Sequence, residues 1–263
     1  MSDAVIELAG VTKWFAMRGV SAEALGEVRL KVAAERFVAL TGPSGCGKST
    51  ILNLVAGLIE PTTGAVLYDG ASVGHPNRRV GYMTQKDTLL PWRTVADNIG
   101  VPLELACRAV PKAERHDRVA QMIELVGLAG FERHYPAELS GGMRRRAALA
   151  RMLIYEPETL LLDEPFGALD AQLKLVMQQE LARLTQTRKM TVMFVTHDLP
   201  EAIALADEVV VFTRRPGRIR TLCPIHLPRP RDVVSVRFTP QFAAYHDLLW
   251  NELKQEFADG PPT

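Results

Sequence analysis

Apolar runs alternate with amphipathic segments along most of the chain. Runs that predict strands occupy residues 5–8, 33–41, 66–68, 80–83, 159–162, 191–195 and 209–212. Helical spacing of apolar residues predicts helices that begin near residues 48, 94 and 140, and helices over residues 112–126, 173–185, 200–206 and 241–257. The later strand runs are continuously apolar, which is typical of parallel strands buried on both faces. We therefore predict an α/β fold with a mostly parallel sheet.

One stretch interrupts the alternation of strands and helices. Residues 88–155 have a mostly helical pattern, and Thr94 is expected to be the N-cap of the first helix there. We predict a single domain over residues 1–225, with this helical subdomain inserted at about residues 88–155. A segment rich in proline and arginine follows Gly217, and residues 226–263 are expected to form a short C-terminal extension that ends in a helix.

Charge and cysteine content exclude several kinds of protein. The 263 residues carry a net charge of +1, so bulk electrostatics do not favour binding to nucleic acid. The three arginines at 144–146 are accordingly interpreted as a solvated helix face, and residues 229–231 as a surface linker. The three cysteines, Cys46, Cys107 and Cys223, are widely scattered, which predicts neither a disulfide framework nor a metal-ligand cluster and fits a reducing compartment.

The sequence also bears on location. Its first residues lack the basic and apolar regions of a signal peptide, and no apolar run approaches the ~18 residues that span a bilayer. We expect a soluble, cytoplasmic protein that reaches a membrane only through another chain.

The strongest local motif lies between the predicted strand that ends at residue 41 and a predicted helix. It consists of Gly42, Pro43, Ser44, Gly45, Cys46, Gly47, Lys48, Ser49 and Thr50. Its glycines allow successive backbone N–H groups to point into one concavity, and the helix start adds further donors and a positive dipole end. Lys48 can then reach the β- and γ-phosphates of a nucleotide, and the Ser49 hydroxyl can bind Mg²⁺. The alternative, a glycine turn with a chance lysine, is disfavoured by the strand–loop–helix context.

Polar residues directly follow three other predicted strands. They are Gln85, the pair Asp163 and Glu164, and His197. The ends of parallel strands meet at one edge of the sheet, where open α/β folds bind ligands. There Asp163 can bind Mg²⁺ directly or through water, and Glu164 can accept a proton from an attacking water. Gln85 can orient that water or contact Mg²⁺, and His197 can donate a hydrogen bond to the γ-phosphate.

Each of these signals is weak when taken alone. Gln85 could be an ordinary loop residue, His197 a structural histidine, and the Asp163-Glu164 pair a helix-capping device. Their order along the chain, together with the phosphate loop, makes them specific.

These motifs together resemble the ATP-binding cassette (ABC) family over about residues 4–225. Residues 139–143, Leu-Ser-Gly-Gly-Met, resemble the family signature, and residues 167–170, Gly-Ala-Leu-Asp, a further family motif. The resemblance implies a P-loop NTPase core of the ABC ATPase type, with a mostly parallel sheet, an antiparallel β portion and a helical subdomain. Two departures are Met143, where glutamine is usual, and Gly167, where many members have serine.

The resemblance also implies how ATP is held. The family forms a head-to-tail dimer in which each ATP lies between one phosphate loop and the partner's signature, here Ser140, Gly141 and Gly142. The predicted helix start at Ser140 agrees, because it offers N–H donors to a γ-phosphate. The family pattern places Phe15 on the adenine ring, with Trp14 as the neighbouring alternative. Core packing is the simpler interpretation for either aromatic residue taken alone.

Two stretches resemble the nitrate, sulfonate and taurine importer branch, namely residues 89–98 and residues 214–232. This resemblance implies an ATP-hydrolysing subunit, peripheral at the cytoplasmic face of the inner membrane, for uptake of a small anionic solute. Its partners would be a second copy of itself or a homologous ATPase subunit, two transmembrane permease subunits and, indirectly, a solute-binding protein. A non-transport ABC ATPase that acts as an ATP-gated dimerisation module is the alternative.

In that branch the segment after Gln85 lines a groove that receives a helix of the membrane subunit. Trp92 would be an aromatic anchor there. The alternative is that Trp92 is a core tryptophan of the helical subdomain.

Overall fold

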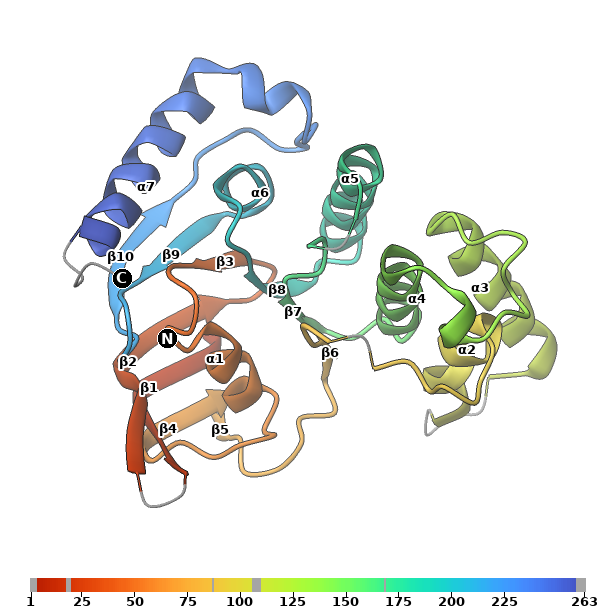
Figure 1. Cartoon of the computed structure of the whole chain (residues 1–263), viewed down its shortest axis with the longest axis horizontal. Coiled ribbons are helices and arrows are strands. Elements are labelled where there is room, and N and C mark those ends of the chain that lie inside the picture. The colour runs from red at the N-terminus through yellow and green to blue at the C-terminus, as the bar shows by residue number, and fades with distance from the viewer. Residues whose placement is uncertain (1–3, 18–19, 87, 106–109, 168, 259–263) are drawn as a thin grey trace.

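The computed structural model describes the whole chain except residues 1–3, 18–19, 87, 106–109, 168 and 259–263. Cys107 and Ala168, both singled out from the sequence, lie outside the described residues. Figure 1 shows two sheets with their covering helices, and beside them a group of three helices, α2 to α4. Among the described residues, no helix combines the length and the apolar character needed to cross a membrane.

The larger sheet has six strands in the order β10-β9-β3-β8-β7-β6. These strands are β3 (Phe37–Thr41), β6 (Val80–Met83), β7 (Thr159–Asp163), β8 (Thr191–Val195), β9 (Glu208–Phe212) and β10 (Ile219–Pro224). All neighbouring pairs are parallel except β10 with β9. The strands β3, β7 and β8 are buried along their whole length, as their continuous apolar runs predicted. The predicted mostly parallel sheet is confirmed.

A second sheet is antiparallel, with strand order β2-β1-β4-β5. Its strands are β1 (Ala4–Met17), β2 (Val20–Ala33), β4 (Thr63–Tyr68) and β5 (Ala71–Ser72). The predicted strand over residues 33–41 was wrong in its first part. The chain turns at residues 34–36, where Glu35 has a left-handed φ of 61°, and β3 begins only at Phe37.

The helices agree closely with the predicted ones. They are α1 (Lys48–Val55), α2 (Val95–Leu105), α3 (Lys112–Leu125), α4 (Gly141–Leu153), α5 (Ala171–Thr187), α6 (Leu199–Leu205) and α7 (Pro240–Ala258), with short 3₁₀ turns at Pro136–Glu138 and Ser235–Phe238. Capping side chains explain where several begin. The hydroxyls of Thr94 and Ser140 and a carboxylate oxygen of Asp170 each accept a hydrogen bond from the backbone N–H three residues later.

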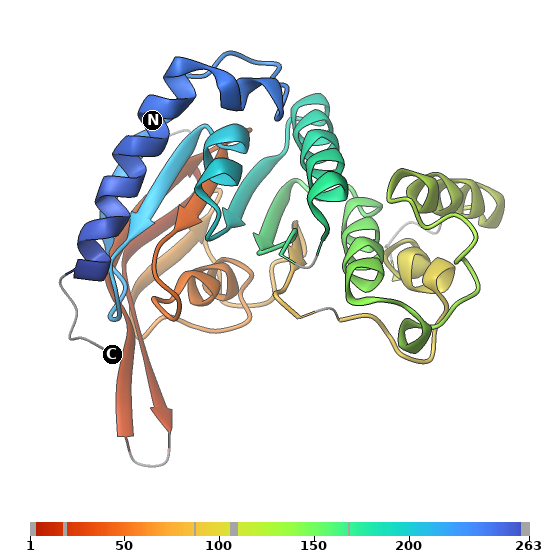
Figure 2. The same ribbon diagram turned by 45° about the horizontal axis from the view of Figure 1, so that its top comes forward.

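Successive residues of the central strands feed two apolar clusters on opposite faces of the larger sheet, because side chains alternate along a strand. On β8, Met193 and Val195 join α1 and the antiparallel sheet, whereas Val192 and Phe194 join the other helices. Figure 2 shows α1 on one side of the larger sheet and α5, α6 and α7 on the other.

The segment rich in proline and arginine is more ordered than its composition predicted. Residues 219–224 within it form β10. The interpretation of residues 229–231 as a surface linker agrees with the exposure of Arg229 and Pro230 but was wrong for Arg231. Arg231 is 4% exposed, and its guanidinium donates hydrogen bonds to the carbonyls of Ala206, Ile225 and Leu227. These bonds hold the segment against the end of α6.

Candidate nucleotide-binding site

The phosphate loop follows β3 and ends where α1 begins at Lys48. Gly42, Gly45 and Gly47 have φ values of 146°, 76° and 99°, which a residue with a side chain adopts only with strain. A Cβ atom at Gly47 would also lie 2.5 Å from Cδ2 of Leu25. The backbone conformation therefore favours glycine at all three positions, as the sequence predicted, and close packing adds to this at Gly47.

The Lys48 side chain lies within this loop. It is buried, and Nζ donates hydrogen bonds to the carbonyl oxygens of Gly42 at 2.8 Å and Pro43 at 2.9 Å. The backbone of the phosphate loop therefore holds the ammonium group. The N–H groups of the same loop lie next to it, at the start of α1. This arrangement places a fixed positive charge inside the proposed anion site.

The polar residues after β6, β7 and β8 meet at one sheet edge, as predicted. The Gln85 side-chain amide lies 3.4 Å from one Glu164 carboxylate oxygen, and Nδ1 of His197 lies 3.4 Å from the other. The His197 side chain is 68% exposed, so the imidazole remains accessible. Glu164 has a left-handed φ of 48°, and its N–H donates to the Val195 carbonyl on β8.

A cavity of about 360 Å³ separates the phosphate loop from this cluster. The predicted site residues that line it are Phe15, Ser44, Gly45, Gly47, Lys48, Ser49, Thr50, Gln85, Glu164 and His197. Gly42, Pro43, Cys46 and Asp163 are not among the described lining residues, and Cys46 and Asp163 are buried. Phe15 rather than Trp14 faces the cavity, which favours Phe15 as the contact for a base.

Three lining residues, Ala24, Val195 and Arg215, were missed from the sequence. Arg215 precedes the turn between β9 and β10, and its Nε donates to the Glu23 carbonyl at 2.8 Å. It lies nearly 200 positions from Phe15 in the chain, in the stretch that carried the importer resemblance. Backbone hydrogen bonds that Gly217 makes with Ala24 and Gly26 help to bring this turn to the site.

Asp163 ends β7 and is almost fully buried, with a hydrogen bond between its carboxylate and Ser49. Burial raises the pKa of Asp163, and the Glu164 charge adds to this, while the Ser49 hydrogen bond opposes it. A hydroxyl and a carboxylate oxygen are ligands that suit Mg²⁺. The pair Ser49 and Asp163 therefore fits a magnesium ion, whereas Gln85 points to Glu164.

We expect Asp163→Asn to stabilise the nucleotide-free protein. The raised pKa means that the folded state holds a proton at Asp163 more readily than the unfolded chain, so stability from this group is present at low pH and is lost as the pH rises. Near neutral pH the variant should melt about 2–4 °C higher, the effect of ~1 kcal/mol in a chain of this size. Thermal melts with and without Mg²⁺ and ATP test this. A lower melting temperature of the variant at neutral pH would contradict this prediction. So would an increase in its melting temperature with Mg²⁺ and ATP as large as that of the native protein.

The signature residues lie apart from this cavity. Ser140 caps α4, with its Oγ 3.2 Å from the N–H of Met143, and Ser140 and Gly141 are exposed. Ser140, Gly141 and Gly142 are not among the described residues that line the cavity. The Met143 side chain packs against the apolar cluster of the helices, which gives a physical reason for an apolar residue at this position.

The interpretation of residues 144–146 as a solvated helix face was wrong. Arg144 donates to the Leu139 carbonyl, and Arg146 to the carbonyls of Val126 and Gly127. Arg145 is only 5% exposed and is directed to the sheet edge that carries Glu164. All three guanidinium groups are bound to backbone carbonyls.

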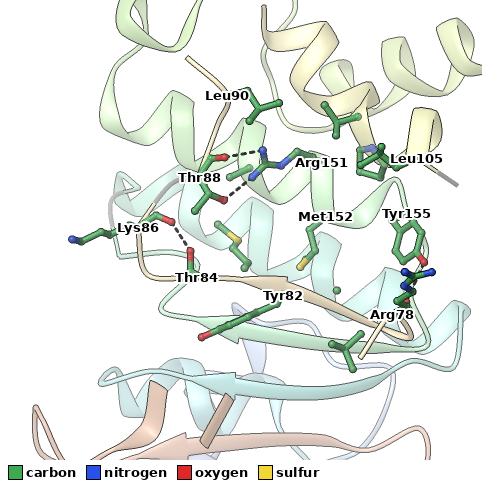
Figure 3. Close-up of a pocket in the computed structure, with 16 residues that line it drawn as sticks. Arg78, Tyr82, Thr84, Lys86, Thr88, Leu90, Leu105, Arg151, Met152 and Tyr155 are labelled. Atoms are coloured by element: carbon green, nitrogen blue, oxygen red, sulfur yellow. Dashed lines mark hydrogen bonds between the residues drawn. The ribbon is translucent and has the colours of Figure 1, made fainter. Parts of the chain in front are cut away.

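A second cavity, of about 630 Å³, lies between β6, α2 and α4 (Figure 3). Its lining combines apolar side chains such as Met83, Leu105 and Met152 with three basic residues, Arg78, Lys86 and Arg151. The described lining residues include no acidic side chain. Figure 3 shows Arg151 bonded to the backbone and hydroxyl oxygens of Thr88, on the segment that leads from Gln85 to this cavity.

Trp92 follows the same segment and is 71% exposed, so the core-tryptophan alternative was wrong. Leu105, at the end of α2, is also largely exposed. The cavity between β6, α2 and α4 is called the groove below. Large apolar side chains lie within it and near it, and nothing in the described chain covers them.

The sequence matches the protein-family model described as ABC transporter over residues 25–167. An ABC transporter ATP-binding protein of Methanocaldococcus jannaschii is 46% identical over 251 residues, which are 95% of this chain and 92% of that protein. The aliphatic sulfonates import ATP-binding protein SsuB of Bacillus subtilis is 42% identical over 252 residues, which are 94% of this chain and 95% of that protein.

Solved structures give the same result at the level of the fold. A dimeric, post-hydrolysis ATP-binding cassette bound to ADP and Pi has a TM-score of 0.78 and is 31% identical, and the match covers 85% of this chain and 100% of that chain. A dimeric bacterial ABC transporter cassette, with a TM-score of 0.79, is 32% identical at the same coverage.

Proposed function

This chain belongs to the ABC transporter family and is an ATPase cassette, and on that premise we propose that it powers an importer of a small anionic solute. The observation that carries the proposal is the meeting of Gln85, Glu164 and His197 across one cavity from the phosphate loop. That arrangement supports roles for Glu164 as the base, for Gln85 as the water-orienting amide and for the exposed His197 as a hydrogen-bond donor to the γ-phosphate.

Hydrolysis then uses the residues as follows. Lys48 and the N–H groups of the phosphate loop bind the β- and γ-phosphates, and Phe15 stacks on the base. Glu164 takes a proton from a water held by Gln85 as the water oxygen bonds to the γ-phosphorus. The bond to the bridging oxygen breaks, and ADP leaves with that electron pair. His197 holds a γ-phosphate oxygen, and Mg²⁺ bound near Ser49 and Asp163 would neutralise phosphate charge.

The exposed start of α4 supports the second half of the proposal, a head-to-tail dimer. The N–H groups near Ser140 and Gly141 point out of a helix terminus and lie outside the chain's own nucleotide cavity. A partner's γ-phosphate is the ligand that such a terminus suits. ATP would therefore close two copies, or this chain and a homologous ATPase subunit, and hydrolysis would let them open.

The groove supports a membrane partner. Its apolar lining and its three basic side chains suit an amphipathic helix that carries acidic residues, which we assign to a transmembrane permease subunit. Gln85 lines the nucleotide cavity, and Lys86 and Thr88 line this groove, so a movement of the nucleotide site can reach the bound helix. The chain would thus act peripherally, at the cytoplasmic face of the membrane.

Trp92→Ala is expected to weaken binding to the permease at least tenfold, since removal of an exposed aromatic anchor from an interface typically costs more than ~1.4 kcal/mol. Trp250→Ala is the control, because Trp250 is 51% exposed but lies on α7, away from the groove. Binding to detergent-solubilised permease and basal ATPase activity are measured for both. Equal loss in the two variants, or none at Trp92, would contradict the assignment.

The full proposal is tested by reconstitution with candidate permease and solute-binding proteins from the same organism. ATP-dependent uptake of nitrate, a sulfonate or taurine into vesicles is the expected result. ATP hydrolysis and ATP-driven dimerisation, together with no binding to a permease and no uptake, would instead support the alternative, a non-transport ATPase.

A further inference from the structure

Arg145 makes an unusually large set of contacts for one side chain. Its guanidinium donates hydrogen bonds of 2.5–3.2 Å to five backbone carbonyls, which lie at or just after the ends of two neighbouring strands. The acceptors are the carbonyl oxygens of Thr84, Gln85, Asp163, Glu164 and Pro165. The first two follow β6, and the other three are the last residue of β7 and the two residues after it.

The chemistry of arginine suits this position. A guanidinium has five N–H donors in a rigid planar fork, so one buried side chain can bind carbonyls from two loops at once. Both loops carry side chains of the proposed reaction, Gln85 on one and Glu164 on the other. Glu164 also has a left-handed φ, a conformation that costs energy in a residue with a side chain and must be held by its surroundings.

Arg145 joins these loops to a third element. It lies on α4, whose first turn begins at Ser140 and presents the signature N–H groups. A displacement of α4 therefore carries the carbonyls of Gln85 and Glu164 with it. Arg151, six residues further along α4, donates hydrogen bonds to Thr88, so α4 also binds the chain beyond Gln85.

We propose that Arg145 is a positioning residue that sets the backbone of Gln85 and Glu164 relative to the signature helix. The proposal rests on the proposed ATPase dimer. In that dimer the partner's ATP contacts Ser140, and Arg145 relays the resulting position of α4 to the chain's own catalytic loops. Each nucleotide site thereby prepares the other for hydrolysis.

Arg145→Gln and Arg145→Lys test this, with Arg146→Gln as the matched control on the same helix. Glutamine has two N–H donors and lysine three, each set on a single nitrogen, so neither can bind all five carbonyls of the two loops. We expect kcat to fall about 10- to 100-fold in both variants, as displacements of about 1 Å do in enzymes. The Kd for ADP should stay within about twofold, because the phosphate loop carries most of that binding. Arg146, which binds Val126 and Gly127, should leave both quantities within about twofold.

The split between kcat and nucleotide affinity separates positioning from a general structural role. All assays are run well below the melting temperature of each variant, as measured by circular dichroism. A folded Lys variant with native kcat would overturn the proposal, and so would parallel losses of kcat and ADP affinity. A native protein that fails to hydrolyse ATP would instead overturn the proposed function.

A measurement on the protein with its own Arg145 guards against variants that do not fold. Amide hydrogen exchange is followed for Glu164→Gln protein, with and without ATP. Protection should rise together at residues 84–86, 141–146 and 163–165. Protection of residues 141–146 alone would show that α4 and the catalytic loops move independently, and would overturn the proposal.

Discussion

Glu164→Gln protein is expected to bind ATP, to dimerise on it and to lose at least about 100-fold in turnover. The glutamine keeps the shape of the side chain and its contact distance to Gln85, but its amide cannot accept the proton of the attacking water. General-base catalysis contributes about 10²–10⁴-fold to rates, which sets the size of the expected loss. Because ATP then persists in the site, the closed dimer should accumulate.

Release of inorganic phosphate measures turnover, and light scattering with ATP or ADP measures the dimer. Glu27→Gln is the matched control, since Glu27 lies on β2 and pairs with Arg29 on the protein surface. Turnover within a few-fold of the native protein would exclude Glu164 as the base. Full loss of turnover without an ATP-stabilised dimer would leave the base assignment standing and would contradict the head-to-tail dimer.

Lys48→Ala is expected to lose nucleotide binding itself. The ammonium already lies inside the phosphate loop, held by the carbonyls of Gly42 and Pro43, so phosphate oxygens need only replace those carbonyls. A hydrogen bond to a charged group contributes about 1.5–3 kcal/mol, which corresponds to a 10- to 100-fold increase in the Kd for ATP.

Isothermal titration with ATP and Mg²⁺ measures this increase, with Lys189→Ala as a control at an exposed lysine. Lys48→Ala and Glu164→Gln should lose different properties of the protein. Lys48→Ala loses binding and dimerisation together, whereas Glu164→Gln loses only turnover. An unchanged Kd in Lys48→Ala protein would show that the loop N–H groups alone hold the phosphates.

Much of the candidate site was predictable because its residues stand next to strands with clear patterns. The apolar runs located β7 and β8, and the polar residue after each, Glu164 or His197, had to lie at the same sheet edge once the strands were parallel. The glycines of the phosphate loop predicted its unusual backbone for a similar local reason. Helix starts at Thr94 and Ser140 followed from side chains that accept hydrogen bonds from the first turn.

What the sequence did not predict depends on contacts between distant segments. The arginines at 144–146 look like a solvated charge run, since nothing local reveals that Arg145 is buried against the carbonyls of two other loops. Arg231 was misread for the same reason. The turn before β3 was missed because two alanines precede it, and small apolar residues suit a strand and a turn almost equally.

The position of β3 in the middle of the larger sheet has a consequence for folding during synthesis. β3 pairs on one side with β8 and on the other with β9, both of which belong to the last third of the chain. At usual elongation rates these strands emerge from the ribosome about 10–30 s after β3. The β1–β2 hairpin can form at once from local contacts. The phosphate loop cannot take its final position until β3, the strand before it, has paired. Until β8 and β9 arrive, the exposed apolar edge of β3 is a natural target for chaperones.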